Sequence, residues 1–104
     1  MSDFDIEKIN DVIHGRLRLG VMAYLANAEA ASFTELKEAL NVTQGNLSIQ
    51  MRKLEEADYV AIDKRIVDRK PLTTVRITKA GREAFAAYLE ALSGVLGKDI
   101  KPDS

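Results

Sequence analysis

The sequence contains no cysteine and a single histidine, His14, among its 104 residues. Without cysteine it cannot form disulfides, sense redox state through thiols or build a cysteine-based metal site, and one imidazole cannot make a multi-histidine site. No apolar run approaches the roughly 20 residues that span a bilayer. The acidic, polar first eight residues are unlike a secretory signal. We therefore expect a cytoplasmic protein with no metal and no cofactor.

Catalytic motifs are also missing from the sequence. It has no glycine-rich phosphate-binding loop, no cysteine nucleophile and no pattern that pairs histidine with carboxylates. An enzymatic mechanism would have to depend on His14 alone, and a structural role at a helix junction suits that residue better. We therefore expect that the protein is not an enzyme.

The composition is that of an ordinary globular protein, with 46% hydrophobic and 30% charged residues. A chain of this length is expected to form one domain with one modest core, here residues 1–97. Gly94 and Gly97 weaken the end of the last predicted helix, so residues 98–104 are expected to be a frayed tail.

Charge is unevenly distributed along the chain. The formal net charge is −1 and the isoelectric point is about 5.8, which is unfavourable for a non-specific nucleic-acid binder. However, nine Lys and Arg residues face five Asp and Glu residues between Gln44 and Arg82, whereas the rest of the chain has six against eleven. Positive charge is therefore concentrated in one part of the sequence, where a nucleic acid would be attracted.

That part overlaps a helix-turn-helix pattern between Thr34 and Leu54. A first helix over 34–40, a turn at 41–43 and a second helix over 44–57 place apolar residues on one side, and Thr43 is a good N-cap for the second helix. The polar residues of the second helix then face outward. This pattern is typical of a helix that enters the DNA major groove.

The flanking segments complete the predicted fold. Apolar spacing predicts helices over 3–13, 16–27 and 79–96, the last capped by Thr78. Alternation predicts strands over 59–64 and 72–77, which form a hairpin around a basic loop, 65–71. The predicted fold class is mostly α with a small β-hairpin, in the order α-α-α-α-β-β-α, with a short extra strand near 32–34 as an open alternative.

In this order of elements the chain resembles the small winged helix-turn-helix transcriptional regulators related to the MarR and ArsR groups. Four blocks carry the resemblance, and together they cover nearly the whole chain. They are Ile13-His14 with Arg18-Leu19 and Val21-Met22; Phe33 to Leu36; Thr43 to Ser48 with Leu54-Glu55 and Tyr59-Val60; and Lys70-Pro71 with Thr73, Ile77-Thr78, Gly81-Arg82 and Phe85. One departure is Asp58, which stands where the family usually has glycine.

The resemblance implies a sequence-specific regulator of transcription that binds double-stranded DNA. The second helix of the motif would enter the major groove, the hairpin or "wing" would lie on the flanking minor groove or backbone, and residues near 32–37 would contact phosphates. The expected DNA-binding residues are Ser32, Thr34, Lys37, Thr43, Gln44, Gly45, Asn46, Ser48, Ile49, Arg52, Arg65, Arg69 and Lys70.

The resemblance also implies a homodimer. The residues support the same expectation, because the first and last predicted helices carry more apolar surface than a small DNA-binding head requires. The expected interface residues are Ile6, Ile9, Ile13, Phe85, Tyr88, Leu92 and Leu96. A small-molecule effector is compatible with this family, although no residue pattern specifies one. The alternative hypothesis is a winged-helix module that binds proteins through the same surfaces and does not bind specific DNA.

Overall fold

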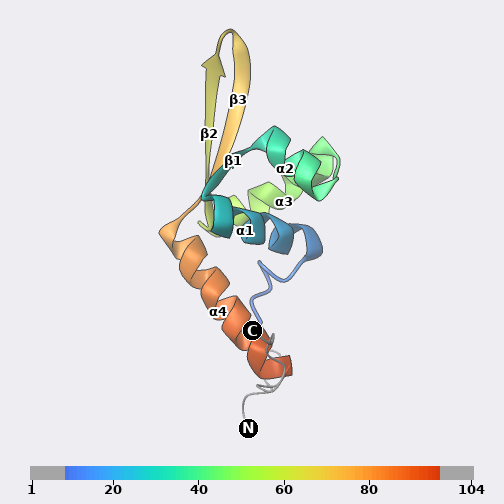
Figure 1. Ribbon diagram of the computed structural model, residues 1–104, viewed down its shortest axis with the longest axis vertical. Helices are drawn as coiled ribbons and strands as arrows, with labels where there is room; N and C mark the ends of the chain where they lie inside the picture. Colours follow the sequence, from blue (N-terminus) through green and yellow to red (C-terminus); the bar gives the residue numbers. More distant parts are fainter. Residues whose placement is uncertain (1–8, 97–104) are drawn as a thin grey trace.

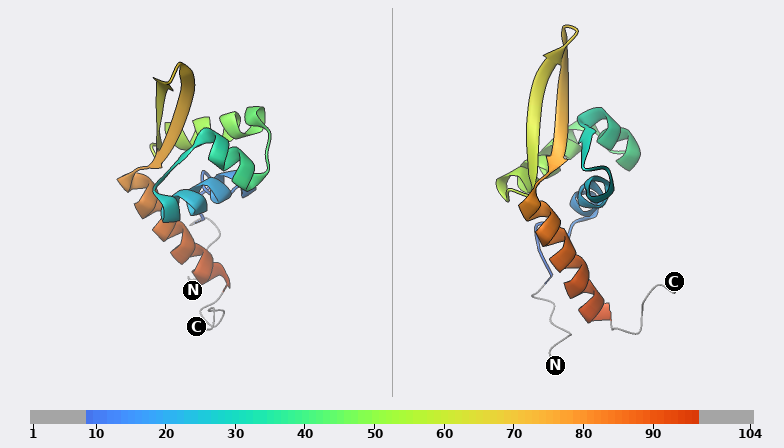
Figure 2. Two further views of the ribbon diagram at one scale, coloured as in Figure 1. Left: turned by 45° about the horizontal axis from the view of Figure 1, so that its top comes forward. Right: turned by 60° about the vertical axis from the view of Figure 1, so that its left-hand side comes forward.

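The computed structural model describes residues 9–96, and these form four helices and one small antiparallel sheet. The helices α1, α2 and α3 lie together beside the base of the sheet, whereas the hairpin β2–β3 and the helix α4 extend in opposite directions from this head (Figures 1 and 2). The predicted fold class is confirmed. The elements are α1 (Arg16–Ala28), β1 (Ala30–Ser32), α2 (Phe33–Leu40), α3 (Gln44–Glu56), β2 (Val60–Val67), β3 (Lys70–Ile77) and α4 (Lys79–Leu96).

The segment before α1 differs from the prediction of a helix over 3–13. Residues 9–15 contain no helix, and the rest of the predicted helix lies outside the described residues. Asn10 explains the difference, because its side-chain oxygen accepts hydrogen bonds from the backbone N–H groups of Val12 (2.8 Å) and Ile13 (3.1 Å). This local side-chain bonding competes with helical bonding and holds a turn. The helix predicted over 16–27 is confirmed as α1.

The helix-turn-helix forms as predicted. Ser32 caps α2 in a capping box, in which its hydroxyl accepts from the N–H of Glu35 (3.0 Å) while the Glu35 carboxylate accepts from the N–H of Ser32 (2.9 Å). Thr43 caps α3 by accepting from the N–H of Asn46 (3.2 Å). The two caps define where both helices begin, and Asn41, in the left-handed conformation, ends α2.

The sheet has the order β1-β3-β2 and is antiparallel throughout. The extra strand lies at Ala30–Ser32, two residues before the predicted 32–34, because Phe33 already begins α2. The wing strands are longer than predicted. Arg65 to Val67 and Lys70 to Pro71 continue the strands, so that the predicted loop 65–71 shrinks to the two-residue turn Asp68-Arg69.

The core lies where α1, α2 and α3 meet the base of the sheet and one side of α4. Its buried residues include Val21, Met22 and Leu25 of α1, together with Ile9, Ile13, Ala31, Leu36, Leu47, Met51, Leu54, Val60, Val75, Ile77 and Tyr88. Thr78 caps α4 as predicted, because its hydroxyl accepts from the N–H of Gly81 (2.8 Å). Within residues 9–96, no helix combines the length and apolar character needed to cross a membrane.

Candidate nucleic-acid interface

The helix α3 presents a clear division between a buried and an exposed side. Leu47, Met51 and Leu54 point into the core and fix the rotation of the helix. The side chains predicted to contact DNA are exposed, and even the apolar Ile49 is 56% exposed. The exposed predicted residues on this helix are Gln44, Gly45, Asn46, Ser48, Ile49 and Arg52.

The N-terminal half of α3 is better suited to an anionic partner than the C-terminal half. Its first turn contains no acidic residue, and the N-terminus of a helix attracts negative charge. The last turn instead contains Glu55 and Glu56, both exposed. A duplex can therefore approach the first turns of α3 with less repulsion than the last turn.

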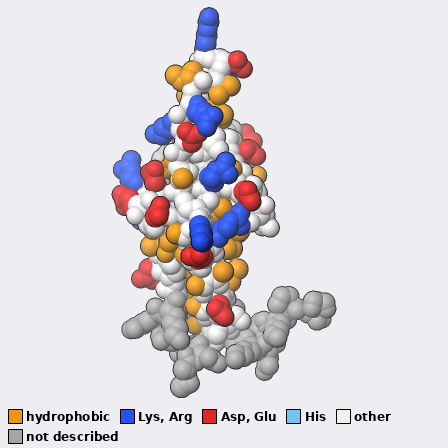
Figure 3. Space-filling model, turned by 90° about the vertical axis from the view of Figure 1, so that its left-hand side faces the viewer, with side chains coloured by type: hydrophobic (Ala, Val, Ile, Leu, Met, Phe, Trp, Pro, Cys, Tyr) orange, Lys and Arg blue, Asp and Glu red, His pale blue; other side chains and the backbone are white. Residues whose placement is uncertain are grey.

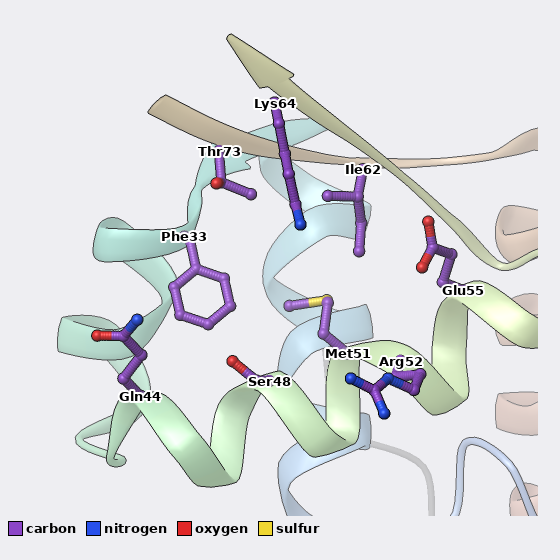
Figure 4. Close-up of a pocket in the computed structure, with 9 residues that line it drawn as sticks. All are labelled: Phe33, Gln44, Ser48, Met51, Arg52, Glu55, Ile62, Lys64 and Thr73. Carbon is purple, nitrogen blue, oxygen red and sulfur yellow. The ribbon is translucent and has the colours of Figure 1, made fainter. Parts of the chain in front are cut away.

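A groove of about 280 Å³ separates α3 from the wing. Gln44, Ser48 and Arg52 line it from α3, and Lys64 reaches toward them from β2 (Figure 4). The remaining lining residues are Phe33, Met51, Glu55, Ile62 and Thr73. Two cations, Arg52 and Lys64, thus face one groove from two elements, with one carboxylate at its end.

Lys64 was not among the DNA-binding residues predicted from the sequence, although the alternation of residues along β2 indicates which way its side chain points. Val60 and Ile62 point toward the helices, and residues two apart on a strand lie on the same face. Lys64 continues that face toward the wing tip, so that its exposed side chain lines the groove opposite α3.

The predicted wing residues are exposed but do not share one face. Arg65 lies on the outer face of β2, opposite to Lys64, and forms an ion pair with Asp63 (2.6 Å). Arg69 and Lys70 lie at the tip of the wing. Figure 3 shows basic side chains at this tip and along the wing, interspersed with apolar and acidic ones.

The turn at the wing tip has an unusual backbone. Asp68 and Arg69 both have positive φ values, 53° and 65°, as a two-residue hairpin turn of type I′ requires. Glycine and asparagine favour this conformation, whereas arginine adopts it at a cost of about 1–2 kcal/mol. A strained residue at an exposed tip is a common feature of functional loops.

The three predicted phosphate-contacting residues near the start of α2 differ in how free their side chains are to contact DNA. The hydroxyl of Ser32 is occupied as the cap of α2, Thr34 is exposed, and Lys37 is half-buried. The hydroxyl of Thr43 is likewise occupied as the cap of α3. The capping residues can still offer backbone groups to a phosphate, but their hydroxyls already stabilise the motif.

A side-chain network along the other flank of α3 was not predicted. The guanidinium of Arg18 donates to the side-chain oxygen of Gln50, and the Gln50 amide donates to the side-chain oxygen of Asn46 (3.3 Å). Arg18 also donates to the backbone oxygen of Val12. This network connects the turn before α1 to a residue of the exposed side of α3.

Three of the residues predicted for the dimer interface are enclosed within their own chain. Ile9, Ile13 and Tyr88 are at most 7% exposed within one chain, because the turn 9–15 folds against α4, where His14 Nδ1 lies 2.9 Å from the hydroxyl of Tyr88. Phe85 and Leu92 are half-buried. Ile6 and the side chain of Leu96 lie outside the described parts of the chain.

One exposed apolar residue on α4 was absent from the predicted interface. Leu89 is 48% exposed and lies one turn from both Phe85 and Leu92, so the three form a stripe along the helix. Leu89 is the most exposed of the three, because Phe85 and Leu92 are half-buried.

Comparison with known proteins agrees with this geometry. An uncharacterised protein of Methanocaldococcus jannaschii is 36% identical over 78 residues, which cover 75% of this chain and 85% of that protein. The transcriptional regulator homologue of Pyrococcus horikoshii has a structure that matches with a TM-score of 0.85 at 31% identity, over 97% of this chain and all of that one.

A more distant structure, a MarR-like transcriptional regulator of Thermotoga maritima, matches with a TM-score of 0.59 at 23% identity, over 95% of this chain and 66% of that one. Residues 17–96 match the family model described as a winged helix DNA-binding domain. The chain therefore belongs to the winged helix DNA-binding domain family, and its structural neighbours include MarR-like transcriptional regulators.

Proposed function

We propose that the protein regulates transcription by binding a specific DNA sequence, with the first turns of α3 in the major groove. The observation that carries this proposal is the groove in which Gln44, Ser48 and Arg52 face Lys64 of the wing. The major groove is about 12 Å wide and admits one helix. With α3 seated there, the neighbouring phosphate strand would run between α3 and the wing.

The residues divide into those that read bases and those that hold the backbone. Gln44 and Arg52 have side chains that can pair with adenine and guanine edges, respectively. Lys64, Thr34 and Lys37 would contact phosphates, which set the register without reading sequence. A protein with this role acts where the chromosome is, so we place it in the cytoplasm.

Arg69 offers a test of the wing in which stability and binding should change in opposite directions. Arg69→Gly relieves the positive φ and should raise the free energy of unfolding by about 0.5–1 kcal/mol, measured by urea denaturation. The same variant loses one cation and should reduce the slope of log affinity against log salt concentration by about 1.

Arg69→Lys is the matched control, since it keeps the charge and the strain. It should leave both the stability and the salt slope close to those of the wild type. An Arg69→Gly variant with unchanged affinity at every salt concentration would remove the wing tip from the DNA interface.

We further propose that two copies associate through the stripe Phe85, Leu89 and Leu92 on α4. A twofold pair would place two α3 helices about one turn of DNA apart, roughly 34 Å, and would read a palindromic site. Because the stripe is apolar and partly exposed in one chain, association would remove it from water.

The dimer can be tested by light scattering. The wild type should scatter as a particle of about twice the 11.5 kDa of one chain. Leu89→Glu should halve that mass, whereas Ile66→Glu, at a wing position that is 77% exposed, should leave it unchanged. A wild type that remains monomeric at micromolar concentration would contradict the dimer.

The alternative, a protein-binding module, is favoured by one observation. Ile66, Val67 and Leu72 expose apolar side chains on the wing, at 77%, 46% and 40%. Failure to bind any duplex at low salt would favour this alternative over the regulator.

A further inference from the structure

The guanidinium of Arg18 lies at the centre of the network on the flank of α3 that faces away from the wing. It donates to the backbone oxygens of Val12 and Asp11 on one side and to the side-chain oxygen of Gln50 on the other. The turn that supplies these two carbonyls is itself held in place, because the Asn10 amide donates to the hydroxyl of Tyr59 (2.9 Å). Arg18 therefore connects a fixed turn to the middle of α3.

Gly15 allows Arg18 to take this path. A Cβ atom at position 15 would lie 2.8 Å from a terminal nitrogen of the guanidinium, closer than a carbon atom can approach without a shift. The glycine at the start of α1 thus leaves the space in which the Arg18 head group lies. The contact between Arg18 and Gln50 spans 32 residues of sequence and is half-buried, unlike a free surface side chain.

The chemistry of Arg18 determines which way the Gln50 amide points. A guanidinium has only donors, so the Gln50 atom that faces it must be the oxygen. The nitrogen of Gln50 then points along the helix to Asn46, and it can only donate there. The Asn46 atom that accepts must therefore be its oxygen, which leaves the Asn46 nitrogen as the group directed outward.

Within residues 9–96, the Asn46 side-chain nitrogen has no acceptor, although the backbone N–H of Asn46 bonds to the cap Thr43. An outward donor alone pairs with N7 of a purine or with O4 of thymine. Adenine also presents an amino group, N6, beside its N7 acceptor, and the second lone pair of the Asn46 oxygen remains for that group. A flipped amide would instead present its oxygen to the groove, which suits the amino group of cytosine.

We propose that Arg18 and Gln50 are positioning residues that fix the Asn46 amide with its donor outward, so that Asn46 selects adenine at one base pair. This inference rests on the proposed function, because it concerns how α3 reads DNA. Arg18 and Gln50 act through Asn46 and need not touch the duplex.

The experiment selects bound duplexes from a random-sequence pool and compares the base preferences of four variants with those of the wild type. Asn46→Ala identifies the base pair that Asn46 reads. Arg18→Met keeps the length and apolar stem of the side chain but removes its donors. Gln50→Glu keeps the bond to Arg18 but cannot donate to Asn46. Arg82→Met is the control.

Arg82 is a suitable control because it is a second arginine that ties two helices together away from α3. It pairs with Glu29 (3.4 Å) and donates to the backbone oxygen of Ala26. Because these contacts are exposed, loss of Arg82 should lower stability only modestly, without changing the base preference at any position.

At the base pair that Asn46→Ala identifies, Arg18→Met and Gln50→Glu should each reduce the preference for adenine by about 3- to 10-fold, part of the discrimination that one bidentate contact provides. Preferences at the other base pairs should remain. Gln50→Glu also adds a negative charge, so its affinity should fall for all sequences alike, which is separable from a change at one base pair.

A wild-type preference at that base pair in folded Arg18→Met and Gln50→Glu variants would overturn the inference and leave the proposed function intact. The same holds if Asn46→Ala changes no base preference. A wild type that enriches no sequence would overturn the proposed function and this inference together. Melting temperatures of all four variants establish that each protein is folded at the temperature of selection.

Discussion

Arg52→Ala should lower the affinity for the selected DNA by about 1–3 kcal/mol and relax the base preference at one position. Arg52 is the one arginine on the exposed side of α3, and it lines the groove opposite Lys64. Its guanidinium can contact the O6 and N7 atoms of guanine with two parallel hydrogen bonds. Competition binding with duplexes that differ at one base pair measures both effects.

Arg76→Ala is the matched control for Arg52. Arg76 is an exposed arginine on β3, on the face opposite to the buried Val75 and Ile77, and it does not line the groove. Its loss should leave the base preference unchanged. Equal losses in the two variants would mean that only net charge matters and that Arg52 reads no base.

Gly81→Ala should lower the free energy of unfolding by about 2–4 kcal/mol, the combined cost of overpacking and of a lost backbone hydrogen bond. A Cβ at Gly81 would lie 2.1 Å from the backbone oxygen of Tyr59, which already accepts from the N–H of Thr78 (3.0 Å). A rotamer change cannot relieve this contact, because the clashing atom belongs to the Tyr59 backbone. The first turn of α4 must therefore move away from the exit of α3.

Gly45→Ala provides the comparison for Gly81→Ala in the same urea denaturation experiment. No described atom lies within 4 Å of a Cβ at position 45, and alanine is the better helix former by up to about 1 kcal/mol. This variant should be as stable as the wild type or more so. A Gly81→Ala variant within about 0.5 kcal/mol of the wild type would contradict the packing at the start of α4.

The helix-turn-helix and α4 could be predicted because their signals are local. Thr43 and Thr78 are caps whose side chains bond to the N–H group three residues ahead, and the apolar spacing that follows each cap is helical. Asp58, at a position where glycine is usual, has a φ of 66°, as expected for the residue that follows a helix end. Such features depend on few neighbours.

The predicted helices and strands were wrong in extent where the local structure depends on residues far away in the sequence. The turn at 9–15 depends on Asn10, whose side chain accepts from the backbone N–H groups of Val12 and Ile13 and donates to the hydroxyl of Tyr59, 49 residues away. β1 is three residues long and forms only by pairing with β3. The wing strands extend beyond their alternating core because they pair with each other up to Val67 and Lys70.

The sequence predicted that the candidate residues of α3 are exposed. It did not predict which side chains of other elements contact or face them. Exposure of the residues on α3 follows from helical periodicity, which the sequence carries. To predict that Lys64 lines the groove, one must know which residues of β2 face the helices. To predict the link from Arg18 to Asn46, one must know that the turn before α1 lies close to α3. The burial of Tyr88 within its own chain could not be predicted either, because an apolar stripe in a sequence does not indicate whether its own chain or a partner covers it.

Selection of bound duplexes from a random pool by the wild-type protein tests the central claim most directly. The account predicts enrichment of one sequence with two related halves about 10–10.5 base pairs apart, bound with an affinity that falls steeply as salt is raised. A pool that stays random at about 50 mM salt, or equal binding of every duplex, would contradict a sequence-specific regulator.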